Sequence, residues 1–513
     1  MACKCLGASG EGNVADVITC LEYVQTMKEQ GINIIATSNS WVVNPGRRPG
    51  ENFSQALYDA IEAQQQQGIL FITAAGDDTK NNDRGHDVYP ANFDLPNVIA
   101  VAATTSSDML AIYSNVGRHT VHLAAPGGDN IFPGILSTLP GNAYGGLFGS
   151  TRAAVPHVTG VAALLQAQDL NRDWRAIKNL LFAGGDPLPD LADTTLTGRQ
   201  LNARGSLTCT NAPVLSRFRP SSDTSSVALG TPVEVSVLHI NCATPAGEVA
   251  VVVNPGNETI ILRDSGVDGD QAAGDGLYTA RWTPATAGTY TLTFPGREGQ
   301  DDHVSVQVLA NYTYTATRFV WRQITGANLN LWADFFSPPL PLPFAIPFGG
   351  VDYTTLYVSP HGTLNFTGPF TTSRFSDSTN ESIPTTASPT VVAPFWDRLA
   401  PQHGTDQNVF WAVMGNAPHR EIVFEWRHVA YEFWLCNGDS AAGLTFQVVF
   451  FEGRSDILFN YAQTTFGGAC PSSPDHGAGA TVGVQVTSDT GTQLSFNTPS
   501  LHDQMALLWT VSQ

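Results

Sequence analysis

The sequence lacks any apolar run of the roughly 20 residues that a helix needs to cross a bilayer. The segment before Gly31 also lacks a basic stretch followed by an apolar one, which is the pattern of a secretory signal peptide. We therefore expect a soluble chain that does not span a membrane and carries no export signal of its own.

Basic residues are scarce: the 513 residues contain 25 lysines and arginines against 45 aspartates and glutamates, a formal net charge of -20. Such a charge repels phosphate backbones and anionic lipid headgroups, which argues against nucleic acid and membrane surfaces as partners. Charged residues make up only 14% of the chain, whereas 48 glycines and 32 prolines are present. This balance favours turn-rich β structure over long solvated helices.

The chain contains seven cysteines, and this odd number leaves at least one thiol unpaired. Three lie near the start of the chain and four in its later regions: Cys3, Cys5, Cys20, Cys209, Cys242, Cys436 and Cys470. The last four can close two loops through disulfides, but spacing alone does not fix which cysteine pairs with which.

The first 208 residues alternate helical and strand-like patterns. Apolar residues recur at helical spacing over residues 14–30, and residues 54–67 form a second helical pattern. Residues 32–41 and 69–76 read as short buried strands. Continuous apolar strands that alternate with helices indicate a parallel α/β sheet, which we assign to residues 1–208.

After Cys209 the sequence changes to Val- and Thr-rich segments separated by Gly, Pro and Asp turns. Strand-like segments at residues 234–240, 248–253 and 288–294 suit an immunoglobulin-like sandwich over residues 209–310. Residues 311–513 contain alternating, aromatic-rich segments that predict a second sandwich. The sequence therefore predicts a multidomain protein, in which an α/β domain is followed by two mostly antiparallel β-sandwiches.

The segment GSTRAAVPHVTGVAALL, residues 149–165, places a Gly-Ser-Thr turn before a helix with Pro156 in its first turn. A hydroxyl there meets the positive end of the helix, beside backbone N–H groups that can stabilise an oxyanion. The segment closely resembles the nucleophile motif of the subtilases, Gly-Thr-Ser-Met-Ala-x-Pro-His-Val. Four more segments resemble the same family in the same order: GILFITAAGDD, VYPANFDLPNVIAVAAT, YSNVG and LAAPG. The resemblance implies an N-terminally truncated subtilisin-like domain, a parallel sheet flanked by helices.

The nucleophile motif is altered. Counting from Gly149, the serine of the family falls on Thr151, with Ser150 in place of the preceding threonine. Counting back from Pro156, the same position falls on Arg152, because the motif has one extra residue. Neither count reaches a serine, and nucleophilic catalysis needs close placement of the hydroxyl. Thr151 and Ser150 are the candidate nucleophiles that the resemblance leaves.

Two other positions depart from the family pattern. The asparagine that donates to the oxyanion is replaced by Asp77, and an ionised carboxylate donates nothing. The substrate-binding edge, Ser-Leu-Gly or Ser-Trp-Gly in the family, reads Ser40, Trp41 and Val42. Val42 adds a branched side chain where a peptide backbone approaches closely, so we expect a narrowed groove.

The catalytic order of the family is Asp, His, Ser, but the first 208 residues contain no Asp-Ser/Thr-Gly and no His-Gly-Thr-His segment. His86, His119 and His122 are the histidines that precede the nucleophile turn, and their surroundings favour surface or structural roles over that of a general base. A missing upstream part would explain the absent Asp and His. It would not explain the altered motif, Asp77 or Val42.

In the second domain, four aspartates lie among glycines: Asp264, Asp268, Asp270 and Asp275. This density of carboxylates suits a hard cation such as calcium, which takes six to eight oxygen ligands. The alternative is an Asp-rich turn that only caps strands, and the sequence leaves both interpretations open.

The third domain contains VDYTTLYVSPHGTLNF (residues 351–366) and PFWDRLAP (residues 394–401), followed by EIVFEW and FQVVFFEG. These segments resemble nidogen-like modules that are appended to secreted peptidases and surface proteins. Trp396, Asp397, Trp426 and Trp434 are candidates for a ligand-binding face. Because the tryptophans fall within strand-like segments, we expect them to pack in the core instead.

The family resemblance implies a subtilisin-like serine endopeptidase that acts on polypeptides outside the cell, with calcium as the one suggested cofactor. The altered positions lead us to interpret this chain as an inactive or incomplete member. The alternative is a non-catalytic secreted adhesion or binding protein that acts through its β-sandwiches.

Overall fold

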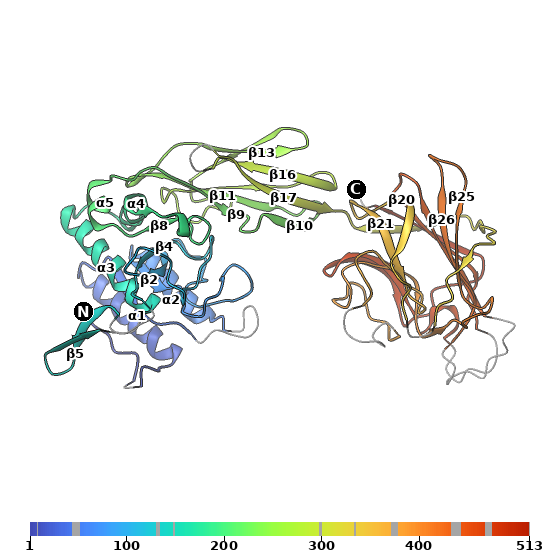
Figure 1. Cartoon of the computed structure of the whole chain (residues 1–513), viewed down its shortest axis with the longest axis horizontal. Helices are drawn as coiled ribbons and strands as arrows, with labels where there is room; N and C mark the ends of the chain where they lie inside the picture. Colours follow the sequence, from blue (N-terminus) through green and yellow to red (C-terminus); the bar gives the residue numbers. More distant parts are fainter. Residues whose placement is uncertain are drawn as a thin grey trace. The chain divides into compact units, whose positions relative to one another are not determined.

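The computed structural model describes residues 1–513 except 8, 44–51, 130–133, 147–148, 297–299, 333–334, 371–377, 432–442, 467–473 and 512–513. The chain forms two compact units (Figure 1). The first contains residues 1–225, 232–282 and 291–305, and the second contains residues 226–231, 283–290 and 306–513. The three-domain division made from the sequence stays a prediction.

The first sheet is the parallel sheet that the sequence predicts. Its strand order is β1-β2-β3-β4-β8-β7, parallel except for the pairing of β7 with β8. The strands are β1 (Ala36–Asn39), β2 (Leu70–Ala74), β3 (Val98–Thr104), β4 (Leu123–Pro126), β7 (Asp186–Pro187) and β8 (Arg199–Gln200). The helices are α1 (Val14–Glu29), α2 (Gln55–Gln66), α3 (Thr151–Gln168), α4 (Trp174–Gly184) and α5 (Ala203–Thr208).

Helices cover both faces of this sheet, because successive strand residues point to opposite sides. Phe71 packs with Leu21 and Ile61, which belong to α1 and α2. Leu70 and Ile72 pack in a second cluster that includes residues of α3 and α4. Strands β2 and β3 are therefore buried along their whole length, which explains their continuous apolar sequences.

Local signals set the element boundaries. The side chain of Asn13 caps α1 by accepting from the N–H of Asp16, and Gly31 follows the helix with a φ of 91°. Strand β1 is shorter than the predicted residues 32–41, because the N–H of Ile34 bonds to the carbonyl of Ile32 in a turn before it.

A short hairpin, β5 (Leu136–Leu139) with β6 (Ala143–Gly146), precedes α3. A 3-10 turn, η1 (Pro189–Leu191), lies between β7 and β8. A disulfide joins Cys3 to Cys20 of α1, and Cys5 is a free thiol. None of the helices in the described ranges is long and apolar enough to cross a membrane.

The second region is a sandwich of antiparallel sheets, as the sequence predicts. One sheet has the order β10-β17-β16-β13-β14, and the other has β12-β11-β15 with β9 paired to β11. The strands are β9 (Val214–Arg219), β10 (Thr224–Ala228), β11 (Val233–Asn241), β12 (Thr244–Pro245), β13 (Val249–Asn254), β14 (Glu258–Leu262), β15 (Leu277–Trp282), β16 (Gly288–Phe294) and β17 (Asp302–Leu309). A disulfide links Cys209, at the end of α5, to Cys242 after β11.

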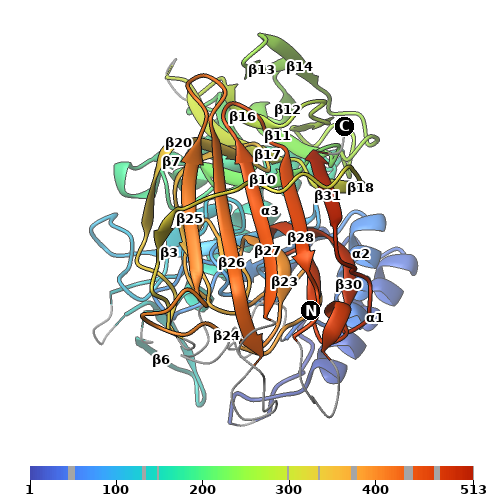
Figure 2. The same ribbon diagram turned by 90° about the vertical axis from the view of Figure 1, so that its right-hand side faces the viewer.

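The third region packs two further antiparallel sheets around one core. Figure 2 looks onto the larger one, with order β18-β31-β28-β27-β26-β25-β19 and β24 paired to β26. Its strands are β18 (Tyr312–Ala316), β19 (Ala327–Asn328), β24 (Leu399–Ala400), β25 (Val409–Met414), β26 (Glu421–Tyr431), β27 (Leu444–Phe451), β28 (Ile457–Gln463) and β31 (Met505–Val511). The smaller sheet contains β20 (Leu340–Phe348), β21 (Val351–Val358), β22 (Leu364–Asn365), β23 (Val391–Trp396), β29 (Thr481–Thr487) and β30 (Thr490–Phe496), and η3 (Asp475–Gly477) precedes β29.

Candidate functional site

The candidate active site lies where the loop after β2 meets the start of α3. Ser150 is the N-cap of α3, and Thr151 is its first residue. Two glycines make this approach possible. Gly76 has a φ of 112°, and a Cβ on Gly149 would lie 2.5 Å from the carbonyl oxygen of Asp129. The sequence motif therefore folds into the turn-to-helix geometry that its residues predict.

The carboxylate of Asp77 is the centre of this site. Its Oδ1 accepts from the N–H of Thr151 at 2.7 Å and from the hydroxyl of Thr151 at 2.9 Å. Its Oδ2 accepts from the hydroxyl of Ser150 at 2.8 Å. The guanidinium of Arg152 lies 3.2 Å from the same oxygen. The N-cap residue of α3 and its first two residues thus all contact one carboxylate.

The two candidate nucleophiles differ in exposure and in use. Thr151 is fully buried, and its hydroxyl oxygen also accepts from the N–H of Gly76 at 3.2 Å. Ser150 is partly exposed, and its hydroxyl oxygen accepts from the N–H of Arg152 at 3.1 Å. The hydroxyl of Ser150 therefore caps α3, whereas that of Thr151 links Asp77 to the backbone of Gly76. Helix α3 continues without a break from Thr151 through Pro156 to Gln168.

The histidines of this region lie in other environments. The Nε2 atom of His86 is 3.6 Å from the carboxylate of Asp78. The ring of His119 contacts that of Phe218 at a tilt of 49°, with centroids 4.2 Å apart, and burial lowers the pKa of His119. His122 accepts from the N–H of Ala100 at 3.0 Å, and burial lowers its pKa to about 3. Within the described ranges, none of the hydrogen bonds found joins these three rings to Ser150 or Thr151.

The predicted substrate edge follows β1. Ser40, Trp41 and Val42 are each partly exposed. The ring of Trp41 meets Phe71 edge-on with centroids 6.2 Å apart, and Val42 packs against the core. The narrowing expected from Val42 stays a prediction, since residues 44–51 lie outside the described ranges.

Three of the four predicted aspartates in the sandwich converge. Single oxygens of Asp264, Asp270 and Asp275 all lie within 4.8 Å of one another. Asp268 is not in this cluster. Its side chain is exposed, and its backbone has a φ of 58°. Burial raises the pKa of Asp264, against the effect of N–H bonds from Gly276 and Gly274.

Backbone N–H groups and one ammonium contact the clustered carboxylates. Asp270 accepts from the N–H of Ala272 at 3.2 Å, and Asp264 accepts from that of Gly276 at 2.9 Å. The ammonium of Lys178, on α4, lies 3.2 Å from Asp275, and both side chains are buried. Lys178 is thus the one cation found in contact with the cluster among the described residues.

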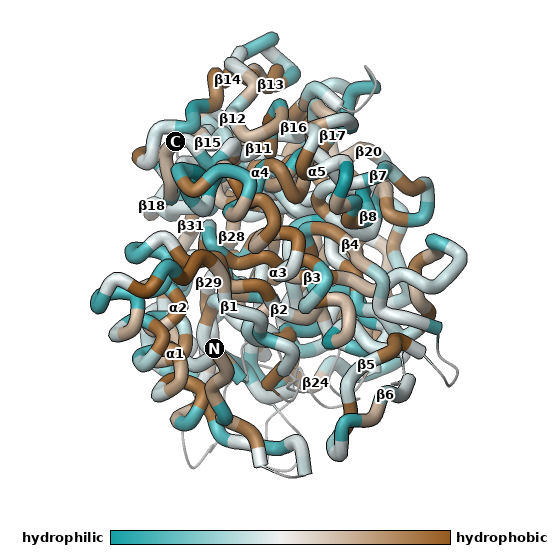
Figure 3. Tube along the Cα trace, turned by 90° about the vertical axis from the view of Figure 1, so that its left-hand side faces the viewer, coloured by the Kyte–Doolittle hydropathy of each residue, from teal (hydrophilic) through white to brown (hydrophobic). Residues whose placement is uncertain are grey.

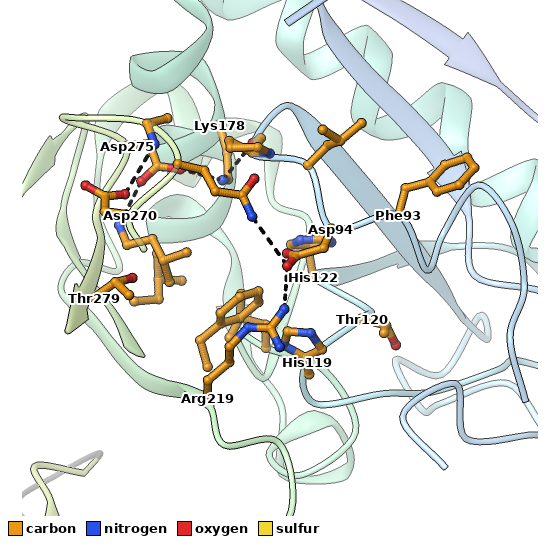
Figure 4. Close-up of a pocket in the computed structure, with 18 of the residues that line it drawn as sticks. Phe93, Asp94, His119, Thr120, His122, Lys178, Arg219, Asp270, Asp275 and Thr279 are labelled. Atoms are coloured by element: carbon orange, nitrogen blue, oxygen red, sulfur yellow. Dashed lines mark hydrogen bonds and ion pairs between the residues drawn. The ribbon is translucent and has the colours of Figure 1, made fainter. Parts of the chain in front are cut away.

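Figure 4 shows the cavity of about 50 Å³ that adjoins this cluster. His119 and His122 line it beside two ion pairs, Lys178 with Asp275 and Arg219 with Asp94. Lys178 and Asp94 come from the α/β part, whereas Arg219 and Asp275 come from the sandwich. This cavity could not be predicted from the sequence, because the residues of its two ion pairs are far apart in the chain.

In the third region, Trp396 and Trp426 are fully buried, as expected for core residues, and Trp434 lies outside the described ranges. Asp397 is also buried, and its Oδ2 has no hydrogen-bond partner among the described residues. Burial raises its pKa to about 6, although the N–H of Arg398 and the hydroxyl of Tyr431 bond to it. Cys436 and Cys470 lie outside the described ranges.

Comparisons with known proteins find family matches in two parts of the chain. Residues 1–197 match the model of the "Subtilase family", and residues 311–508 match that of "NIDO related". Over 177 residues the chain is 32% identical to Subtilisin Savinase of Lederbergia lenta, covering 34% of this chain and 56% of that protein. It is 35% identical over 170 residues to an extracellular protease of Xanthomonas campestris, covering 32% of this chain and 27% of that protein.

A solved structure of a cold adapted subtilisin-like serine proteinase has 28% identity and a TM-score of 0.33, covering 39% of this chain and 65% of that one. The chain spans between 27% and 56% of the length of the two relatives named above. The two family models therefore identify residues 1–197 as a subtilase-family region, which has the expected nucleophile turn and parallel sheet, and residues 311–508 as a NIDO-related region.

Proposed function

We propose that this chain is an extracellular, subtilase-derived binding protein that does not hydrolyse peptides by the serine mechanism. One observation carries the proposal: Arg152 and Asp77 form an ion pair of 3.2 Å at the start of α3. The unbroken helix supports the motif count from Pro156, which puts Arg152 at the nucleophile position. The resemblance puts Asp77 at the position of the oxyanion donor. The two catalytic positions thus hold a mutually neutralising pair.

The electrostatics of the site oppose acyl transfer. An oxyanion needs free N–H donors at the end of the helix, but Asp77 accepts the N–H of Thr151 and Ser150 accepts that of Arg152. A negative charge that developed beside Asp77 would be repelled by its carboxylate. The carboxylate of Asp77 therefore stabilises the guanidinium of Arg152 and would not stabilise a tetrahedral intermediate.

The second candidate is acyl transfer by Ser150, because its hydroxyl is partly exposed and donates to Asp77 at 2.8 Å. Activation of a serine needs a base that accepts its proton and remains near it. Asp77 contacts the hydroxyl, but the same carboxylate is held by Thr151 and Arg152, which favours its ionised, charge-paired state.

Hydrolysis of casein separates the two candidates. The intact chain should release no peptides above a blank at neutral to alkaline pH, with Subtilisin Savinase as the active control. Measurable turnover that Ser150→Ala abolishes would establish the acyl-transfer candidate and overturn the proposal.

We also propose that calcium binds Asp264, Asp270 and Asp275. Three carboxylates converge with one ammonium, so the cluster carries excess negative charge. Each carboxylate oxygen has two lone pairs, so an N–H bond leaves room for a hard cation. A bound ion would screen the repulsion between these carboxylates and stabilise the loop.

The proposed location outside the cell rests on two features. The structure contains the disulfides Cys3–Cys20 and Cys209–Cys242, which persist in oxidising compartments. The similar protein of Xanthomonas campestris is described as an extracellular protease. Polypeptides are the proposed ligand class, and the net charge of -20 opposes nucleic acid and anionic membranes.

A further inference from the structure

Most large apolar side chains of this protein are buried, as expected for folded cores. In the α/β part, Figure 3 shows hydrophobic residues concentrated in elements such as β2 and α3, which pack in its interior. Trp332, in the third region, departs from this pattern because it is 59% exposed. Tryptophan offers a large, flat apolar ring with one N–H donor, and exposed tryptophans are therefore candidates for ligand contact.

The sheet topology brings two loops together beside Trp332. Strand β19 pairs with β25 at one edge of the larger sheet, onto which Figure 2 looks. The chain leaves β19 through residues 329–332 and enters β25 through residues 402–408. The N–H of Leu329 still donates to the carbonyl of Val409 at 2.9 Å beyond the end of β19. The two loops therefore leave the sheet side by side, on a rigid support.

Side-chain amides fasten these loops to each other. The Oδ1 atom of Asn330 accepts from the N–H of Gly404 at 3.1 Å. The buried side chain of Asn408 bonds to both main-chain groups of Leu331, accepting from its N–H at 2.9 Å and donating to its carbonyl at 3.0 Å. The backbone that leads into Trp332 is thus fixed, which reduces the ordering cost that binding of a ligand would have to offset.

The ring of His403 orients the indole of Trp332. The two rings stack with centroids 4.5 Å apart and an interplanar angle of 20°. His403 thus covers one face of the indole, and the exposed surface of Trp332 belongs to the opposite face and the ring edges. We call this stacked pair the Trp332 platform.

The side chains next to the platform select the kind of occupant. Asn330 and Gln402 are exposed and lie two residues before Trp332 and one before His403, so they bring amide donors and acceptors to the platform. A sugar ring matches both features, because its hydroxyl groups bond to amides and its positively polarised C–H groups pack on the negative face of an aromatic ring. The exposed carboxylate of Asp406 opposes an acidic sugar.

We propose that the Trp332 platform binds a neutral β-linked polysaccharide. One pyranose ring stacks on the face of the indole opposite His403, and Asn330 and Gln402 hydrogen-bond to its hydroxyl groups. A β-linked ring with equatorial substituents fits, because its C–H groups then form the flat faces. The proposal concerns the third region alone and is independent of the chemistry at Asp77.

Cellohexaose and chitohexaose, two neutral β-linked oligosaccharides, are the probes. Binding to the intact chain is measured by titration calorimetry, and saturation-transfer NMR identifies the sugar protons in contact. At least one probe should bind, with the strongest transfer at ring C–H protons. Trp332→Ala should weaken binding at least about tenfold, because it removes the stacking surface. Phe496→Ala removes a ring that is 37% exposed in β30, away from the platform in sequence, and should bind within about twofold of the parent.

The role of His403 as a positioning residue has its own test. His403→Ala should weaken binding about threefold, because the indole loses the ring that holds its orientation. His403→Phe keeps a flat ring in the stack and should restore the affinity of the parent. Equal affinities of the parent and His403→Ala would remove His403 from the site.

Two results would overturn the carbohydrate proposal: neither oligosaccharide binds, or Trp332→Ala binds them as the parent does. Binding of tetramethylammonium without binding of either sugar would make the platform a cation site instead. If Trp332→Ala does not fold, the indole N–H resonance of Trp332 in the parent still decides, because it must shift when the sugar binds. Hydrolysis of casein would contradict the proposed function and leave the carbohydrate proposal untouched.

Discussion

Two sites of the first unit differ in how the charge of their carboxylates is balanced. At the start of α3, the single carboxylate of Asp77 has its own guanidinium from Arg152 and hydroxyl and N–H donors from Ser150 and Thr151. In the sandwich loop, three carboxylates within 4.8 Å of one another have the ammonium of Lys178. The first site is balanced in charge, whereas the second keeps a negative excess.

The difference teaches what each site can accept. A balanced site has no electrostatic reason to take up an anion, so we expect the turn at Asp77 not to stabilise an oxyanion. A site with negative excess stabilises a cation. On this account, aspartate opposes oxyanion stabilisation at the first site and supports cation binding at the second.

Removing Lys178 should break the comparison most strongly. Lys178→Met leaves Asp275 as a buried carboxylate without its cation, which should cost about 3–5 kcal/mol of unfolding free energy. Saturating calcium should restore most of this loss, because the ion takes over the charge balance. Chemical denaturation with calcium or with chelator measures both quantities.

The matched control is Arg175→Met, which breaks the exposed pair of Arg175 with Asp173 one helical turn away and should cost less than about 1 kcal/mol. A Lys178→Met variant as stable as the parent in chelator would show that the cluster needs no cation.

Asp397 extends the comparison to a buried carboxyl whose Oδ2 has no hydrogen-bond partner among the described residues. Its folded pKa of about 6 lies above the ordinary value of 3.8. The stabilisation is therefore complete below pH 4, where both states are protonated, and about 3 kcal/mol is lost as the pH rises through 6.

Denaturation of the intact chain as a function of pH, followed by hydrogen exchange in β23, measures this slope. Asp397→Asn should flatten it, whereas Asp406→Asn, at an exposed position, should leave it unchanged. A parent chain whose β23 is equally stable at pH 4 and pH 7 would refute the buried acid.

Calcium sharpens the contrast between the two sites. At a concentration of 100 times its dissociation constant, it should stabilise the unit by about 2.7 kcal/mol. Asp264→Asn should abolish most of the shift in thermal midpoint, and Asp268→Asn should keep it, because Asp268 lies outside the cluster. Coincident midpoints in calcium and in chelator would mean that the loop is only a strand-capping turn.

The smallest effect is expected at Asp77. Asp77→Ala leaves the N–H of buried Thr151 without its acceptor and should cost about 2 kcal/mol. Asp78→Ala, one residue later and more exposed, should cost less than about 1 kcal/mol. Equal stabilities of the two variants would remove Asp77 from its capping role.

The sequence was sufficient for the parallel sheet, since strands buried on both faces need continuous apolar runs such as residues 69–76. The β-sandwiches followed from alternation, as in β13 and β11. Spacing could not give the disulfides, because Cys209 meets Cys242 only after α5 and β11 have packed. The predicted boundary of β1 was too wide, because Ile32, Ile34 and Ile35 are apolar although the residues paired to β2 begin at Ala36.

The candidate site was harder to predict than the fold. The family motifs pointed to Asp77, Ser150 and Thr151. Counting from Gly149 and counting back from Pro156 gave different positions for the nucleophile, and the unbroken start of α3 favours Arg152. The aspartate-rich loop was located from the sequence, but composition could not tell that only three of its four aspartates converge, with exposed Asp268 at a φ of 58° outside the cluster. Lys178 was missed altogether, since it is distant in sequence from Asp275.

Covalent labelling tests the central claim, that Arg152 and Asp77 have replaced the serine chemistry of the fold. The intact chain is incubated with a fluorophosphonate at neutral to alkaline pH in calcium, and its mass is measured, with Subtilisin Savinase as the labelled control. We predict an unchanged mass, because the hydroxyls of Ser150 and Thr151 both donate to Asp77 and are not activated as nucleophiles. A stoichiometric adduct that maps to Ser150 or Thr151, and that Ser150→Ala or Thr151→Val removes, would contradict the account.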